Sequence, residues 1–124
     1  MNVQHDQDTE ILETCIDLLQ AAWQIEDAEL ERLLEVRPGW LRAWRAHEVE
    51  DAATVADCPV RRLLRLHRAL RLVVQPGQYG EYIRRPWRAG SVIGQRSVLD
   101  AVLEEGEPAV EQIAQYLWAK AAGS

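Results

Sequence analysis

The sequence predicts an all-α protein, and three observations lead to this prediction. Apolar residues recur at the three- and four-residue spacing of an amphipathic helix through most of the chain. No segment requires a strand, and no repeat or low-complexity tract interrupts the helical pattern. The 124 residues, 48% hydrophobic and 27% charged, have an ordinary globular composition and are long enough to bury one packed core.

The first part of the chain predicts three helices. Asp8 or Thr9 is placed to cap the first helix, and an apolar stripe marks its buried side. This stripe consists of Ile11, Cys15, Leu18, Leu19 and Ala22. A second helix is expected over residues 27–34, opened by acids that suit the positive end of its dipole. Pro38 is expected to be the first residue of a third helix, which fades into the polar stretch 47–54.

A longer helix is expected to begin at Pro59 and to run from Val60 to about Val74. Its apolar side consists of Leu63, Leu66, Leu70, Val73 and Val74. Its opposite side carries Arg61, Arg65, Arg68, Leu64 and Leu72. The two leucines on this arginine side suggest a second contact there. A short helical turn over residues 79–85 is expected to end before Pro86, because a residue that precedes proline avoids the helical conformation.

The last part of the chain predicts an ordered loop followed by two helices. Residues 87–96 are expected to form the loop, and Ser97 is placed to cap a helix that ends at Gly106. The final helix is expected to begin at Pro108. Its expected apolar face consists of Val110, Ile113, Ala114, Leu117 and Trp118.

Charge is strongly segregated along the chain, although the formal net charge is only −6. Residues 1–35 carry ten acids and one arginine, residues 36–99 carry twelve arginines and five acids, and residues 100–124 carry five acids and one lysine. The three segments therefore have net charges of −9, +7 and −4. A basic middle between acidic ends indicates either a localised anionic partner or ion pairing between the ends and the middle of the same chain.

Residues with catalytic or metal-binding chemistry are few and scattered. Cys15 and Cys58 form no CxxC motif, and the His47-Glu48 pair lacks the second histidine of a metalloprotease helix. His67 is expected to be a half-buried histidine at the edge of an apolar face. No phosphate loop, nucleophile elbow or dinucleotide fingerprint occurs. We therefore expect no enzyme, no metal and no cofactor, and the absence of a signal-like or membrane-spanning stretch favours a cytoplasmic protein.

Residues 25–45 have the length and apolar spacing of a helix-turn-helix, although a plain helical hairpin fits the same pattern. Its first helix would pack Leu30, Leu33 and Leu34 beneath a second helix that turns Leu41 and Trp44 inward. Side chains at the start of the second helix would then face outward, where such motifs contact base edges. The candidate DNA-contacting residues are Arg37, Trp40, Arg42, Arg45, Arg61, Arg65 and Arg68.

The order of several short motifs resembles the Xre/MbcA/ParS antitoxin family over about four-fifths of the chain. The first similar part, residues 15–72, contains Ala22-Trp23, Leu33-Leu34-Glu35-Val36, Trp44-Arg45 and the leucine- and arginine-rich run 63–70. The second, residues 82–117, contains Tyr82-Ile83-Arg84-Arg85-Pro86, the run 93–100, Gly106 and Val110. The chain departs from the family pattern at Glu35, where glycine is usual, and at Trp40, where a small polar base-reading residue is usual.

The resemblance implies an Xre-like helix-turn-helix region over residues 8–75 and a toxin-binding region over residues 76–124. The implied partner is a RES-domain toxin, an enzyme that consumes NAD, whose active-site cleft the C-terminal region of the antitoxin covers. The resemblance also implies binding to operator DNA and a homodimer or a toxin–antitoxin hetero-oligomer, with no membrane partner.

The implied toxin-binding residues lie in and after the loop, where arginine and tryptophan are usual interface anchors. They are Arg84, Arg85, Trp87, Arg88, Arg96, Glu104 and Glu105. An alternative is that the arginines of the loop pair with the acidic ends of the same chain. Two other functions also stay open, a stand-alone helix-turn-helix transcription regulator and a helical adaptor that does not bind DNA.

Overall fold

The computed structural model describes the backbone of residues 3–49 and 52–123 and the side chains of residues 10–49 and 58–123. These residues form seven helices and no strand, which confirms the all-α prediction. The helices are α1 (Val3–Trp23), α2 (Asp27–Leu34), α3 (Trp40–Arg45), α4 (Ala52–Val73), α5 (Tyr79–Arg84), α6 (Val98–Glu105) and α7 (Glu107–Gly123). None of these helices is both long enough and apolar enough to cross a bilayer.

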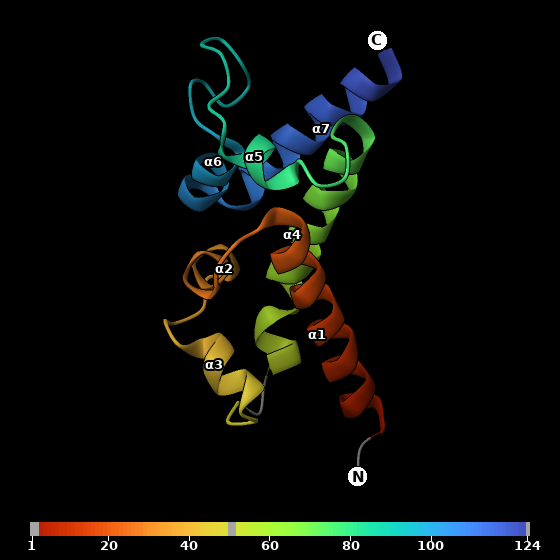
Figure 1. Ribbon diagram of the computed structural model, residues 1–124, viewed down its shortest axis with the longest axis vertical. Coiled ribbons are helices and arrows are strands. Elements are labelled where there is room, and N and C mark those ends of the chain that lie inside the picture. The colour runs from red at the N-terminus through yellow and green to blue at the C-terminus, as the bar shows by residue number, and fades with distance from the viewer. Residues whose placement is uncertain (1–2, 50–51, 124) are drawn as a thin grey trace.

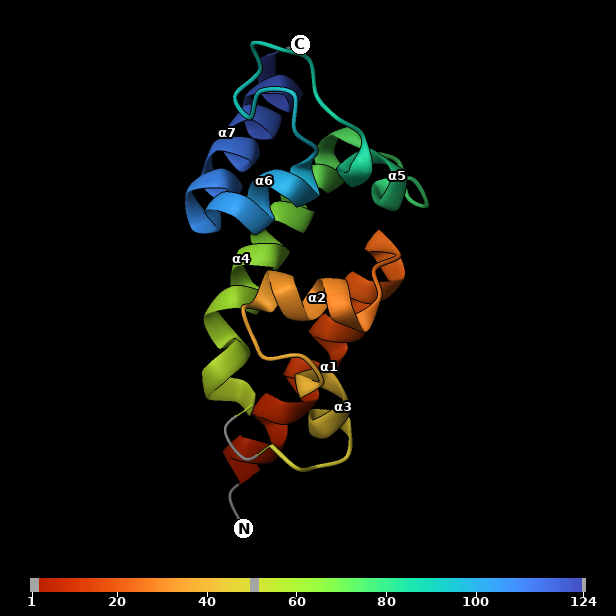
Figure 2. The ribbon, with the colours of Figure 1, turned by 90° about the vertical axis from the view of Figure 1, so that its left-hand side faces the viewer.

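Helix α4 connects the two ends of an elongated molecule (Figures 1 and 2). It packs against α1 and α2 near one end and against α7 near the other. Helices α2 and α3 lie toward the N-terminal end, whereas α5, α6 and the loop between them lie toward the C-terminal end. The two surfaces that the sequence marks for binding are therefore at opposite ends of the protein.

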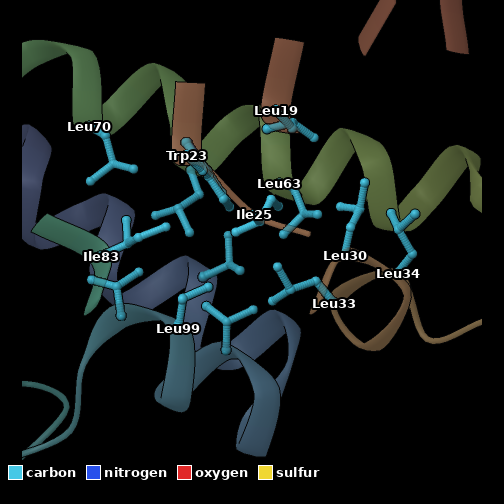
Figure 3. Packing of buried hydrophobic residues seen from close by; sticks show 14 of the residues in the cluster. Leu19, Trp23, Ile25, Leu30, Leu33, Leu34, Leu63, Leu70, Ile83 and Leu99 are labelled. Carbon is cyan, nitrogen blue, oxygen red and sulfur yellow. The ribbon is translucent and has the colours of Figure 1, made fainter. Parts of the chain in front are cut away.

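One continuous apolar core holds the helices together. Figure 3 shows Leu19 and Trp23 of α1 packed with Leu30 of α2 and Leu63 of α4, next to Ile83 of α5. Each of these side chains is almost fully buried, which stabilises the fold by about 1.5–3 kcal/mol per large apolar side chain. The same cluster extends into α6 and α7, so the core continues across the expected boundary at residue 75.

The core contains one histidine, His67 of α4. Its Nδ1 accepts a hydrogen bond from the indole Nε1 of Trp23 at 3.0 Å, and its ring meets Tyr79 edge-on at a centroid distance of 5.0 Å. Burial, together with the positive charge of Arg71, lowers the pKa of His67. His67 is thus a neutral structural residue that joins α1, α4 and α5, and it is more deeply buried than the sequence predicts.

The buried side of α1 differs from the predicted stripe. The buried residues are Leu12, Ile16, Leu19 and Trp23, so that of the predicted set only Leu19 is fully buried. Ile11 and Leu18 are 62% and 42% exposed. Both sets follow helical spacing, and the structure selects the one that buries the large indole of Trp23 against α4 and α5.

Three predicted helix starts are also wrong. Helix α1 begins at Val3, so neither Asp8 nor Thr9 caps it. Helix α3 begins at Trp40 rather than Pro38, because Gly39 has a left-handed conformation (φ 86°) that cannot belong to the helix. Helix α4 begins at Ala52 and contains Pro59.

The amino-acid composition before Pro59 explains why α4 begins earlier than predicted. Its first turns are rich in alanine, which favours a helix, whereas proline removes one backbone hydrogen bond. Residues 50 and 51 of the predicted polar stretch lie outside the described residues.

Predictions for the C-terminal helices hold well. Ser97 caps α6 by accepting a hydrogen bond from the Asp100 amide at 3.1 Å, and Gly106 ends that helix at φ 67°. Helix α5 ends before Pro86, as expected. The predicted apolar face of α7 is buried except for Trp118, which is 53% exposed.

Candidate functional site

The link between α2 and α3 uses two left-handed residues. Glu35 ends α2 at φ 60° and Gly39 precedes α3 at φ 86°. Glycine adopts this conformation readily, whereas a residue with a Cβ is strained in it. The backbone at position 35 therefore favours glycine, and Glu35 occupies this position at some cost in stability.

A buried carboxylate fixes the start of α3 relative to α2. Glu31 lies in α2 with only 6% of its surface exposed, and its Oε2 accepts a hydrogen bond from the Leu41 amide at 2.9 Å. The amides of the first helical turn have no partners within the helix, so a carboxylate there satisfies one of them and suits the helix dipole. Sequence reasoning missed Glu31, since nothing in its spacing distinguishes it from a solvated glutamate.

Trp40 does not face outward as predicted. It is 4% exposed and stacks on Trp44 at a centroid distance of 6.0 Å. Because α3 has only six residues and an indole is large, both tryptophans and Leu41 are buried against the core. Trp40 is therefore a core residue in this structure, and its buried side chain cannot contact the edges of DNA bases.

The arginines of this region divide into exposed and bound ones. Arg37 and Arg42 are exposed and form no ion pair with any residue that the structure describes. Arg45 instead donates hydrogen bonds to Asp27 at 2.9 Å and to Gln20 at 2.7 Å, which ties α3 to α1 and α2. The hydrogen bond from Gln20, followed by the interaction with Arg45, holds the pKa of Asp27 below its ordinary value.

The arginine side of α4 is partly covered by acidic residues. Arg65 pairs with Glu111 at 2.9 Å and with Glu107 at 3.7 Å, both from α7. Arg61 and Arg68 are exposed on the same helix. The predicted basic strip is thus present, but its middle residue binds the acidic end of the chain.

Arg84 binds groups of the same chain, although its side chain is 37% exposed. Its guanidinium donates to the carbonyl oxygens of Trp23, Gln24 and Gly80 at 2.9 Å each and reaches Glu29 at 3.1 Å. Two of these carbonyls lie at the end of α1, which attracts cations. Arg84 therefore joins α5 to α1 and α2 through both terminal nitrogens of its guanidinium.

Arg96 and the two predicted acidic contact residues form one cluster. Arg96 pairs with Glu104 at 2.8 Å and with Glu105 at 2.5 Å, and these hydrogen bonds raise its pKa above the ordinary value. Its Nε also donates to the carbonyl oxygen of Ile93 at 2.9 Å. The cluster holds the end of the loop against α6 and neutralises the positive charge of Arg96.

The loop between α5 and α6 is ordered, as predicted. The Trp87 amide donates to the Arg96 carbonyl at 3.0 Å and closes the base of the loop. Within it, the Ser91 hydroxyl donates to the Gly94 carbonyl at 2.7 Å. These bonds give the loop a defined shape without any regular secondary structure.

An aromatic hollow lies beside this loop. Trp87 is half-buried and contacts Tyr82 of α5 and Tyr116 of α7 at centroid distances of 6.4 Å and 5.1 Å. The hollow has a volume of about 500 Å³ and is lined by Tyr82, Arg85, Pro86, Trp87, Arg88, Ser91, Tyr116 and Lys120. Burial, followed by the neighbouring Tyr116, raises the pKa of Tyr82, so its phenol stays neutral.

Two of the predicted toxin-binding arginines border the hollow. Arg85 pairs with Glu81 one helical turn earlier at 2.6 Å. Arg88 is exposed and forms no ion pair with the part of the chain that the structure describes. Among the predicted residues, the structure thus brings Arg85, Trp87 and Arg88 together on one surface and separates them from the internally bound Arg84.

Tyr82 and Tyr116 also belong to this surface, and sequence reasoning missed them as site residues. Tyr82 stands in one of the quoted motifs, but Tyr116 lies in a different helix, and only the packing of α7 brings its ring to the loop. Exposed aromatic residues at a concave site are typical of interfaces, because they bury much apolar area with little loss of side-chain entropy.

A scan of protein-family models, a search of curated proteins and a search of solved structures each gave no match to this chain.

Proposed function

We propose that this chain is the antitoxin of a type II toxin–antitoxin system and that it neutralises a RES-domain, NAD-consuming toxin by covering its active-site cleft. The motif order in the sequence suggests this class of partner. The observation that carries the proposal is the aromatic hollow, where Trp87 lies beside Arg88, which forms no ion pair with the described residues. This surface has the two residue types that most often anchor a protein interface.

Neutralisation by covering a cleft needs shape and affinity rather than chemistry from the antitoxin. A cleft that binds a pyrophosphate favours positive groups on its own walls, so it would repel an exposed row of arginines. In this chain Arg84 is bound internally, and Arg96 is compensated by Glu104 and Glu105. The contact would then depend on Trp87 and its aromatic neighbours, with Arg88 at the rim pairing with an acid outside the phosphate site.

Co-expression with the product of the neighbouring gene tests this proposal. The two proteins should co-purify, and the chain should restore growth to cells that express the toxin. Replacing Trp87 with alanine should weaken the complex by about 2 kcal/mol or more, or about 30-fold in Kd, since it removes a central anchor. Arg88→Glu should also weaken it, with no effect on folding because Arg88 is exposed.

The matched control is Trp118→Ala, which removes an exposed tryptophan of α7 that does not line the hollow. It should leave binding and growth rescue unchanged. Failure of the wild-type chain to co-purify with the neighbouring gene product or to rescue growth would overturn the antitoxin proposal.

We also propose that α2 and α3 form a helix-turn-helix that binds operator DNA and represses the operon. What supports this is the pair of exposed arginines at the start of α3, Arg37 and Arg42, which form no ion pair among the described residues. They are free to contact phosphates, whereas Arg45 is held by Asp27 and Arg65 by Glu111. Binding through phosphates should weaken steeply as salt concentration rises.

A mobility-shift assay with the DNA upstream of the gene tests the DNA-binding part. The variant R37A/R42A should lose retention and lower the slope of log K against log salt by about 2, one for each phosphate contact removed. Arg32→Ala changes an exposed arginine of α2 and serves as control. Retention by R37A/R42A equal to wild type would exclude this role for α3. DNA binding without a toxin complex would instead identify a stand-alone regulator, and stable multimers in light scattering with neither DNA retention nor toxin rescue would identify an adaptor.

A further inference from the structure

The two walls of the aromatic hollow carry the same pair of groups, an aromatic ring and a cation. On the loop side these groups are Trp87 and the adjacent Arg88. On the α7 side they are Tyr116 and Lys120, which lie one helical turn apart and therefore on the same side of that helix. A ligand between the walls would meet a ring and a positive charge on both sides.

The arrangement of the rings leaves room for a flat group. Trp87 and Tyr116 are inclined by 51° at a centroid distance of 5.1 Å, and Trp87 and Tyr82 meet at 71° and 6.4 Å. Because neither pair is parallel, the rings surround a hollow instead of stacking on one another. Its volume of about 500 Å³ lies within the range of small-molecule sites, about 300–1,000 Å³.

The charge of the hollow is positive. Its lining includes Arg85, Arg88 and Lys120 but no acidic residue, and residues 82–99 contain no acid. Glu81 pairs with Arg85 at 2.6 Å but does not line the hollow. The hollow therefore attracts an anion, although the whole chain has a net charge of −6.

A phosphate monoester suits these cations better than a carboxylate does. It carries about 1.5–2 negative charges at pH 7 and three acceptor oxygens, so it can bind cations of both walls at once. The planar guanidinium of Arg88 can bind two of these oxygens. The hydroxyl of Ser91 already donates to the Gly94 carbonyl, so recognition of the anion depends on the cations.

We propose that the aromatic hollow binds a mononucleotide, with the base against the rings of Trp87 and Tyr116. The phosphate is bound by Arg88 and Lys120. Every base has a π-face, so stacking on these rings requires no particular base. A longer nucleic acid fits less well, because its further phosphates would meet a chain with a net charge of −6.

This inference goes beyond the proposed function and does not rest on it. The titration described next contains no toxin, and the co-purification described above needs no nucleotide, so the failure of one leaves the other standing. If the toxin covers the same hollow, nucleotide and toxin exclude each other, and a mononucleotide would then weaken the toxin complex.

An NMR titration of the ¹⁵N-labelled chain with AMP, adenosine and ribose 5-phosphate tests the proposal. AMP should shift the indole N–H signal of Trp87. It should bind at least about 10-fold more tightly than adenosine, which lacks the phosphate, and than ribose 5-phosphate, which lacks the base.

Two variants at exposed positions separate the roles of the ring and the cation. Tyr116→Ala should weaken AMP binding at least about 10-fold, because it removes one of the stacking rings. Arg88→Ala should weaken AMP binding at least about fivefold and leave adenosine binding unchanged, because it removes only a contact to the phosphate. Circular dichroism should show both variants to be folded.

The matched controls are Trp118→Ala and Arg32→Ala, which remove an exposed aromatic ring and an exposed cation that do not line the hollow. Both should bind AMP like the wild type. A Trp87 signal that does not move at millimolar AMP would overturn the proposal, as would equal affinities for AMP and either fragment. An oligodeoxyadenylate that binds more tightly than AMP at equal nucleotide concentration would overturn the assignment to a mononucleotide.

Discussion

His67 shows how one buried side chain can make stability depend on pH. Its pKa is lowered in the fold, whereas in the unfolded chain it returns to about 6.5. As pH falls below that value, the unfolded chain binds a proton that the folded core excludes, so the free energy of unfolding decreases until the folded pKa is also passed. The stability that a neutral His67 provides is therefore present above about pH 6.5 and is lost on acidification.

We expect urea unfolding at a series of pH values between 8 and 5 to show this loss. Each unit by which burial lowers the pKa of His67 removes up to about 1.4 kcal/mol at low pH. His67→Gln keeps a hydrogen-bond acceptor for Trp23 and cannot be protonated, so its stability should change less over this range. Equal pH dependence in the variant and the wild type would show that other groups cause it.

Gly80 is required for a close approach between α5 and α1. A Cβ at this position would lie 2.8 Å from the carbonyl oxygen of Trp23, a backbone atom that Arg84 also holds. Gly80→Ala should therefore lower the free energy of unfolding by about 1–3 kcal/mol, although alanine usually favours a helix. Gly123→Ala, at a position with no atom within 4 Å, should be neutral in the same thermal unfolding measurement.

At the scale of elements, the link between α2 and α3 is open to a stabilising change. Glu35→Gly should raise the free energy of unfolding by about 1 kcal/mol, because glycine adopts a φ of 60° without strain. The lost ion pair with Arg62, 3.3 Å long and largely exposed on the glutamate side, offsets little of this gain. Glu35→Ala is the control, since it removes the same ion pair but keeps the strain, and a melting temperature for the glycine variant below that of the alanine variant would contradict this explanation.

The sequence predicted the positions of the helices more reliably than it predicted which side of each helix is buried. The period of apolar residues predicted seven helical segments in the right order, and the Ser97 and Gly106 signals located α6 to the residue. Helix α1 has two apolar stripes of nearly equal quality, so only its neighbours decide that Ile11 faces solvent. Trp40 was misplaced for a related reason, because a helix of six residues is too short for its spacing to define a face.

At the scale of the whole molecule, the segregation of charge is largely resolved by pairing within the chain. Arginines of the middle segment bind acids of both ends, as in Arg45 with Asp27, Arg65 with Glu111 and Arg96 with Glu104. The sequence predicted this possibility beside an anionic partner, but it could not match individual partners, because these pairs depend on how distant helices pack. Arg37, Arg42, Arg68 and Arg88 are the candidate contacts that the fold leaves without acidic partners among the described residues.

Releasing one such cluster should raise the affinity of the protein for polyanions. E104Q/E105Q removes the two carboxylates that bind Arg96. The net charge of the protein then rises by two units. We expect elution from a heparin column at higher salt than wild type, with little change in melting temperature because these pairs are solvent-exposed. E13Q/D17N, which changes net charge equally at exposed positions that form no ion pair with the described residues, should shift elution less.

The continuous course of α4 from one end to the other sets how this protein can be degraded. A protease that cut between α6 and α7 would remove the covalent link that holds α7 on α4. Helix α4 also packs against α1 and α2. The nicked chain would then unravel as a unit instead of leaving a surviving N-terminal fragment. A cut there therefore weakens the packing at both ends of the molecule together.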